Sequence, residues 1–267
     1  MSAFVSWFEG LIRSTAWTME IPKSYGAFHL TFTLVGFAVC AFLAWKLRNL
    51  GDAGHRRLLR GIGIYLLAAE IYKQFFCYIV YGGYQWGEFP FQFCSIPMYL
   101  CFIASFLKPG KVTEGMYHYM MTFNLLGGFV AFLEPSGLLH EYVTMTAHSL
   151  IWHMLLVFVG LYLGFSKRTS WEWRRYRTAE FTYLILAAAA FCINLIFWDI
   201  SNGDINMFFI GPRNCPLIVF NSIAESCGWY VASLLLLFSI SLGAFLVFLP
   251  FHFAKKHAAE KRQLQPI

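Results

Sequence analysis

Charged residues are scarce in this chain of 267 residues: Asp, Glu, Lys and Arg together make up 13%, whereas hydrophobic residues make up 58% and the mean hydropathy is +0.57. A soluble protein is about 25% charged and about 45–50% apolar, and it needs polar groups to cover its surface. Disordered chains have a low hydrophobicity and few aromatic residues, whereas this sequence contains 29 Phe, 14 Tyr and 9 Trp. These shortages exclude a soluble enzyme and a disordered chain, and they predict an integral membrane protein.

The hydrophobic residues lie in long continuous runs and do not alternate with polar ones, which argues against an outward-facing β-barrel. A run of about 20 apolar residues crosses a hydrocarbon core of about 30 Å. Seven such runs are present, at residues 26–45, 61–81, 88–107, 115–133, 143–165, 178–198 and 227–251. The sequence therefore predicts an all-α, multi-pass membrane protein with seven transmembrane helices.

Lys and Arg residues cluster at alternate ends of these predicted spans. Of the 20 Lys and Arg residues, 16 follow the first, third, fifth and seventh spans. Because cytoplasmic loops are rich in Lys and Arg, we expect the N-terminus outside and the C-terminus inside. The net charge of +6 reflects this topology and gives no indication of nucleic acid binding.

The predicted organisation has three parts. Residues 1–25 form an outer segment, in which Phe4, Phe8 and Leu11 are spaced as on a short interfacial helix. Residues 26–252 form the seven-helix transmembrane domain, and residues 253–267 form a basic cytoplasmic tail. No linker is long enough to separate two domains.

Motifs for metals, phosphates and nucleotides are missing. The sequence has no CxxC or HxxxH pair of the kind that zinc sites use, and it has neither a phosphate-binding loop nor a dinucleotide fingerprint. The last predicted span contains no lysine, so it cannot form a retinal Schiff base. We therefore expect neither a metal nor a cofactor.

One long connection, residues 199–225, joins the sixth and seventh predicted spans on the predicted outer side. Turn-forming residues interrupt it, including Gly211 followed by Pro212. A loop of this length is consistent either with a functional cap or with an irregular connector at the membrane surface. Cys215 and Cys227 both lie on this side, and a disulfide between them in an oxidising compartment is left open.

Several ionisable side chains lie inside the predicted spans, where an ionised group is costly and therefore indicates function. Counting about 1.5 Å per residue from the basic ends of the helices, we place Lys73, Cys94 and His153 at one depth of about 20 Å. Glu70 lies one turn closer to the cytoplasm. The supporting candidates also include His148, Asn194 and Asn206.

Cys94 and His153 are the predicted catalytic pair. A cysteine attacks as a thiolate, and a neutral histidine at the same depth can remove the thiol proton and return it to a leaving group. Lys73 and Glu70 are three residues apart on one helix, so they can neutralise each other or orient the histidine.

Gln92 and Ser95 flank Cys94, and we expect them to donate hydrogen bonds to a developing oxyanion. Each candidate also has a structural alternative. A cysteine in a span commonly serves only as a small packing residue, and the charged pair on the second predicted span can be a purely structural ion pair. His148 and His153 are about 140° apart around a helix, so they cannot both face one partner.

The segment at residues 89–96, Phe-Pro-Phe-Gln-Phe-Cys-Ser-Ile, resembles the Leu-Pro-Leu-His-Leu-Cys-Ser signature of the bacterial YwaF-like integral membrane family. The fifth predicted span resembles that family's His-Gly-Leu-Ile to Leu-Tyr-Leu stretch, in which His153 takes the position of the histidine. Residues 204–209 resemble part of its Asn-Tyr-Met-Tyr-Leu segment. Gln92 stands where the family has a histidine two residues before the cysteine.

The YwaF-like family is grouped with the transmembrane-protein-164 acyltransferases and, more distantly, with the androgen-induced-gene-type membrane hydrolases. The first likeness implies transfer of a fatty acyl group between lipids through Cys94 and His153. The second implies a threonine nucleophile, for which the third predicted span offers no equally placed residue. We therefore expect an intramembrane acyltransferase or acyl hydrolase that acts on a phospholipid or related membrane lipid, in the bacterial cytoplasmic membrane.

The alternative is a transporter or receptor-like protein. In that case Glu70, Lys73 and His153 form a proton or ligand site, and Cys94 only packs. Such a protein needs a continuous polar path to both membrane surfaces. The cytoplasmic halves of the third, fifth and sixth predicted spans are almost wholly apolar, which argues against this alternative.

Overall fold

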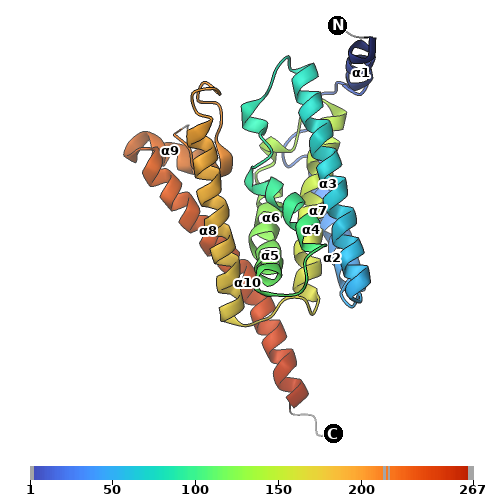
Figure 1. Cartoon of the computed structure of the whole chain (residues 1–267), viewed down its shortest axis with the longest axis vertical. Helices are drawn as coiled ribbons and strands as arrows, with labels where there is room; N and C mark the ends of the chain where they lie inside the picture. The colour runs from blue at the N-terminus through green and yellow to red at the C-terminus, as the bar shows by residue number, and fades with distance from the viewer. Residues whose placement is uncertain (1–2, 213–214, 216, 264–267) are drawn as a thin grey trace.

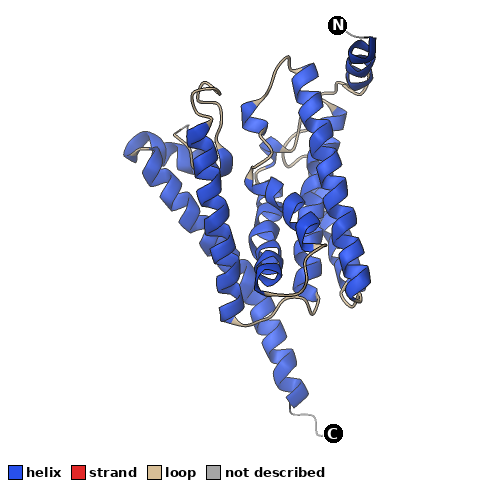
Figure 2. Ribbon diagram, in the orientation of Figure 1, coloured by secondary structure: helices blue, strands red, loops and turns tan. Residues whose placement is uncertain are grey.

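The computed structural model describes residues 3–212, 215 and 217–263, and its side chains up to residue 258. Within these residues the elements are helices joined by loops, and the only β-type pairing is an isolated bridge between Thr18 and Tyr142 (Figure 2). The predicted all-α class is therefore confirmed. The end of the predicted basic tail, residues 264–267, lies outside the described residues, and its beginning continues the last helix.

Five helices in the described part of the chain are long and apolar enough to cross a membrane. Each coincides with a run that the sequence marks as a span, so the membrane character of the chain is confirmed. These helices are α2 (Ala27–Leu47), α3 (Asp52–Val80), α7 (Val143–Phe165), α8 (Trp173–Ile196) and α10 (Trp229–Gln263).

The fourth predicted span is helical but not uniform. It consists of α5 (Lys111–Tyr119), a π-helical turn (Met120–Asn124) and α6 (Leu125–Leu133), which follow one another without a break. In the π turn the side-chain amide of Asn124 donates to the carbonyl of Met120 at 3.3 Å and to that of Leu156 at 3.0 Å. This second acceptor belongs to α7, so the irregular turn is fixed by a contact between helices.

The third predicted span, residues 88–107, is not one helix. Only α4 (Ile96–Ala104) is α-helical there, and it is preceded by two short 3₁₀ turns, Trp86–Glu88 and Phe93–Ser95. Proline explains the difference, because Pro90 has no N–H for a helical hydrogen bond and disfavours helical geometry in the residue before it. Pro97 falls in the first turn of α4, where proline is tolerated.

Helix α7 lies at the centre of the fold. Of its most apolar 18-residue window 61% is buried, compared with 17% for α2. Figure 1 shows α2, α3, α4 and α7 grouped on one side, α8 and α10 on the other, and α5 and α6 between them. Helix α10 instead presents a row of exposed apolar side chains at a spacing of four residues, which suits a face in contact with lipid: Leu234, Phe238, Leu242 and Leu246.

Small residues allow the helices to approach closely at two crossings. At Gly63 of α3, an added Cβ atom would lie 2.7 Å from the backbone nitrogen of Phe102 in α4. At Gly160 of α7, it would lie 2.6 Å from the Cβ of Leu125 in α6. Close contact of this kind replaces the hydrophobic effect, which does not drive helices together inside a bilayer.

Short helices cover the end of the bundle at which the N-terminus lies. The predicted interfacial segment contains α1 (Ala3–Arg13), whose Phe8 packs edge-on against Phe75 of α3 with ring centroids 5.0 Å apart. The long connection before α10 contains a buried stretch at residues 205–208 and the helix α9 (Ile218–Cys227). The described parts of this connection therefore belong to the packed fold (Figure 1).

Candidate active site

Cys94 lies where an irregular segment enters a helix. The chain leaves α3 through Gly82 and Gly83, which adopt positive φ angles of 83° and 152°. It then passes through Pro90 and the 3₁₀ turn Phe93–Ser95, and α4 begins directly afterwards. The positive end of the α4 dipole therefore lies beside Cys94, which is the placement that favours a thiolate.

A hydrogen bond and a group of aromatic contacts hold the Cys94 segment against the rest of the bundle. The indole nitrogen of Trp152 in α7 donates to the Cys94 carbonyl at 2.9 Å. The ring of Phe93 packs edge-on against the rings of Tyr119 and Tyr183, with centroids 6.3 and 6.2 Å away. The hydroxyl oxygens of these two tyrosines are buried without a hydrogen-bond partner among the described residues. Cys94 itself is partly buried.

His153 follows Trp152 on α7, so the histidine is one residue from a direct contact with the Cys94 backbone. Its Nδ1 lies 2.8 Å from the carbonyl oxygen of Ser149. A carbonyl can only accept, so Nδ1 carries the proton and Nε2 presents a lone pair when the ring is neutral. This is the tautomer that a general base requires. The Cys94 thiol and His153 are not hydrogen-bonded to each other in the structure.

Lys73 on α3 is the cation of this region. Its ammonium lies 3.1 Å from Glu70 Oε1, which confirms the expected pairing, and 3.0 Å from Glu88 Oε2. The side-chain amide of Gln74 donates to Glu70 Oε1 at 2.7 Å and to the Glu88 carbonyl at 2.6 Å. The positive charge of Lys73 acts on both Cys94 and His153.

The second histidine of α7, His148, stacks on Trp152 with ring centroids 5.4 Å apart. His140, in the loop before α7, places Nε2 3.0 Å from the hydroxyl of Ser149. Burial lowers the pKa of His140 below its usual value. Both histidines therefore contact residues of α7 that neighbour His153 in sequence.

Gln92 and Asn194 hold the connection before α10. The amide nitrogen of Gln92 lies 3.2 Å from the carbonyls of both Gly87 and Asn206, and its oxygen accepts from the Phe208 N–H at 3.2 Å. Asn194 on α8 accepts from the Met207 N–H at 2.6 Å and donates to the Met207 carbonyl at 3.0 Å. Both hydrogens of the Gln92 amide thus already have acceptors, and neither is available to an oxyanion.

Asn206 belongs to the same clamp, because its side-chain oxygen accepts from the Gly211 N–H at 2.8 Å. The backbone it stabilises is strained, since Phe208 and Phe209 both adopt a φ of 57°. Phe208 is 1% exposed, and its ring meets that of Phe93 edge-on at 5.5 Å. The segment that resembles the Asn-Tyr-Met-Tyr-Leu block therefore packs directly behind the cysteine turn.

The structure thus divides the predicted site residues into two groups. Lys73, Glu70, Cys94, His153 and His148 lie around one region at the junction of α3, α4 and α7. Gln92, Asn194 and Asn206 fix the backbone behind it. Ser95 is buried, and its N–H donates to the Gln92 carbonyl at 2.8 Å.

Three contributors to the site were not predicted from the sequence: Gln74, Glu88 and Trp152. Glu88 is the first residue of the third predicted span, and the turn that brings it back to Lys73 cannot be seen in the sequence. Trp152 did offer a signal, since a buried indole N–H needs an acceptor. In the described residues no group of three His, Cys, Asp or Glu side chains is placed to bind a metal ion. Cys215 and Cys227 are free thiols, the first buried and the second exposed.

A comparison with protein families gives one match, in which the model of the TMEM164 family covers residues 24–257. The matched stretch contains every residue of both groups described above. No curated protein and no solved structure matches the chain.

Proposed function

The chain belongs to the TMEM164 family, and we propose that it is an intramembrane lipid acyltransferase with Cys94 as nucleophile and His153 as base. One observation carries the proposal: Trp152 donates to the Cys94 carbonyl at 2.9 Å, so the segment of α7 that carries His153 lies beside the turn that holds the thiol. The hydrogen bond of His153 Nδ1 leaves Nε2 of the neutral ring with a lone pair. The likeness of residues 89–96 to the YwaF-like signature, which contains a cysteine and no threonine, supports a cysteine nucleophile.

The proposed reaction has two halves. His153 Nε2 takes the thiol proton, Cys94 Sγ attacks the acyl carbonyl of a donor lipid, and a tetrahedral oxyanion forms. The ester C–O bond then breaks, and the leaving alkoxide takes the proton from His153. In the second half the hydroxyl of an acceptor lipid loses its proton to His153 and attacks the thioester, and the thiol is restored. Water in place of the acceptor makes the same site an acyl hydrolase.

Neighbouring groups support each charged stage. The dipole of α4 and the ammonium of Lys73 stabilise the thiolate. Glu70 and Glu88 hold that ammonium in place. The tyrosine hydroxyls beyond Phe93, which have no partner of their own, supply donors for the oxyanion. They take over the role that the sequence suggested for Gln92, whose donors are occupied.

The membrane placement is part of the proposal. We assign seven crossings: the five long helices, the continuous run from α5 to α6, and a third crossing completed by α4 and the segment before it. Irregular backbone is tolerated at membrane depth only where protein covers it. The segment before α4 meets this condition, because Cys94 is partly buried and Ser95 is buried. The N-terminus lies outside and the basic C-terminus inside. The host membrane is the bacterial cytoplasmic membrane, and the partner is a phospholipid or related lipid.

Labelling of the thiol tests the nucleophile. The purified protein in lipid nanodiscs is treated with an acyl-ester probe that leaves a fluorescent acyl group on the attacking thiol. We expect the wild type to be labelled in a bond that neutral hydroxylamine cleaves, and Cys94→Ala not to be labelled. His153→Ala should slow labelling by about 100-fold or more, as loss of a general base does.

Cys101→Ala is the matched control, because Cys101 is a buried packing thiol on α4. It should label within about two-fold of the wild type. Equal labelling of the wild type, Cys94→Ala and His153→Ala would contradict the proposal. It would favour the transporter or receptor-like alternative, in which the cysteine only packs.

A further inference from the structure

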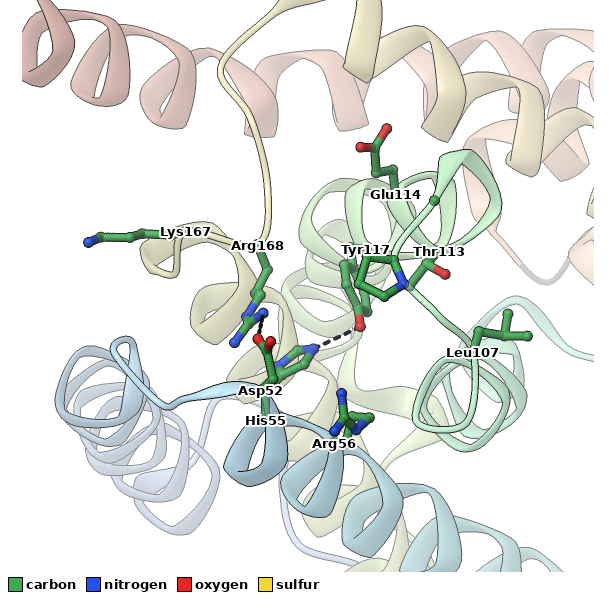
Figure 3. A pocket seen from close by; sticks show the side chains of 11 residues that line it. Asp52, His55, Arg56, Leu107, Thr113, Glu114, Tyr117, Lys167 and Arg168 are labelled. Carbon is green, nitrogen blue, oxygen red and sulfur yellow. Dashed lines mark hydrogen bonds and ion pairs between the residues drawn. The ribbon is translucent and has the colours of Figure 1, made fainter.

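A polar cavity of about 200 Å³ lies at the opposite end of the bundle from α1 and α9. It is formed by the beginnings of α3 and α5 and by the connection between α7 and α8, which carries Lys167 and Arg168 (Figure 3). Its polar lining includes Asp52, His55, Arg56, Thr113, Tyr117 and Arg168. None of these residues takes part in the proposed acyl transfer, so the cavity is a separate feature.

The floor of the cavity is fixed by hydrogen bonds. His55 is 2% exposed, and its two ring nitrogens lie 2.9 Å from the hydroxyl of Tyr162 and 2.8 Å from that of Tyr117. Arg168 pairs with Asp52 and also donates to the Leu50 carbonyl at 3.1 Å. These contacts tie three separate parts of the chain together, and they fix the position of the cavity walls.

Both acids of the lining are already neutralised by arginines. Asp52 pairs with Arg168, and Glu114 pairs with Arg175 of α8, which lies outside the lining. Figure 3 shows the Glu114 carboxylate directed away from Asp52 and Arg168. The remaining charges of the lining are therefore positive.

Two cations of the lining have no anionic partner. Arg56 and Lys167 both line the cavity, and both are exposed. Neither makes an ion pair or a side-chain hydrogen bond with the described residues. In Figure 3 the Arg56 side chain lies beside His55, whereas Lys167 extends outward from the rim. The cavity thus has an arginine at its wall and a flexible lysine at its edge.

The helix ends add to this positive potential. The N-caps of α3 and α5 are Gly51 and Gly110, and neither provides a side-chain acceptor for the first N–H groups. Residues of both first turns line the cavity. The positive ends of two helix dipoles therefore converge on the same space as Arg56.

We propose that this cavity binds the phosphate group of an anionic ligand, with Arg56 as its principal contact and Lys167 closing over it. A phosphate fits because arginine and helix N-termini both recognise its oxygens. The site goes beyond the proposed acyl transfer and does not depend on it. The phosphate belongs either to a lipid headgroup, which the basic end of the bundle meets at the membrane surface, or to a soluble phosphate compound.

Ligand titration of the full chain tests the site. The protein in neutral detergent is titrated with short-chain phosphatidic acid, with inorganic phosphate and with short-chain phosphatidylcholine, and its thermal unfolding midpoint is followed. We expect phosphatidic acid to raise the midpoint more than phosphatidylcholine does. Arg56→Gln should weaken the apparent affinity for phosphatidic acid by about ten-fold, as the loss of a charge-assisted contact does.

Arg57→Gln is the matched control, because Arg57 is the next residue of α3, is exposed and does not line the cavity. It should change the affinity by less than about two-fold. If inorganic phosphate displaces phosphatidic acid and the displacement depends on Arg56, the phosphate group alone is recognised. If only phosphatidic acid binds, the ligand is a lipid headgroup. Equal weakening in both variants, or no binding of either phosphate compound, would overturn the proposal.

Discussion

At the scale of single residues, the charge of Lys73 is shared between two carboxylates in different surroundings. The Glu70 side chain is 5% exposed, whereas that of Glu88 is 51% exposed. Water can solvate Glu88 without help, but it cannot reach Glu70. The buried carboxylate therefore depends on Lys73, and the exposed one contributes mainly to the position of the ammonium.

Substitution of this trio should separate the two ion pairs. Lys73→Met leaves Glu70 as an uncompensated buried charge, and we expect it to lower the free energy of unfolding by about 3–5 kcal/mol. The double variant Glu70→Gln with Lys73→Met should recover most of that loss. Glu88→Gln should cost less than about 1 kcal/mol. Unfolding in a titration of denaturing detergent measures all three, and an equal loss in Lys73→Met and Glu88→Gln would refute the assignment.

Lys73, Glu70 and Glu88 also show which contacts of single residues can be predicted from the sequence and which cannot. Glu70 and Lys73 are three residues apart on a helix, so their pairing follows from helix geometry alone. Glu88 joins them only because two glycines with positive φ reverse the chain after α3. Likewise, the depth of Cys94 and His153 can be counted along the sequence. The free Nε2 of His153 depends on a hydrogen bond that only the folded helix shows.

At the scale of helices, the apolar runs of the sequence predict where the helices lie, but they do not predict where a helix is interrupted or irregular. The long runs coincide with α2, α3, α7, α8 and α10. Run length alone does not foresee that Pro90 prevents a helix before Cys94, or that Asn124 fixes a π turn through α7. Both irregularities lie beside the cysteine turn. The first follows from the local chemistry of proline, whereas the second depends on a contact with α7, which the period of a single helix does not record.

Two glycines of α3 provide a matched test of helix contact. An added Cβ at Gly63 would lie 2.7 Å from the Phe102 backbone nitrogen, whereas at Gly61 nothing lies within 4 Å. Gly61→Ala should raise stability by up to about 1 kcal/mol through helix propensity. Gly63→Ala should lower it by about 1–3 kcal/mol, because the backbone of α4 must move. Thermal unfolding of the two variants in one detergent gives the comparison, and a gain in both would show that α3 and α4 are not in close contact.

At the scale of the whole molecule, the two polar regions lie toward opposite ends of the bundle. The cavity lined by Arg56 is at the end where α3 and α5 begin, and the chain reaches the Glu88 and Cys94 segment only after the full length of α3. Charge bias along the sequence predicts which end faces the cytoplasm. It cannot predict the cavity, because Arg56, Thr113 and Lys167 are far apart in the sequence and meet only through the fold.

The orientation of the molecule is open to a labelling test with thiols at its two ends. Cys227, at the junction of α9 and α10, is exposed, and Lys167 lies at the rim of the opposite cavity. In intact cells, a membrane-impermeant maleimide should label Cys227 if the N-terminal side faces outward, as we propose. In the variant Cys227→Ser with Lys167→Cys, labelling should occur only after the membrane is permeabilised. The reverse labelling pattern would show that the proposed orientation is inverted. Labelling of both thiols in intact cells would show that both positions lie on the outer side of the membrane.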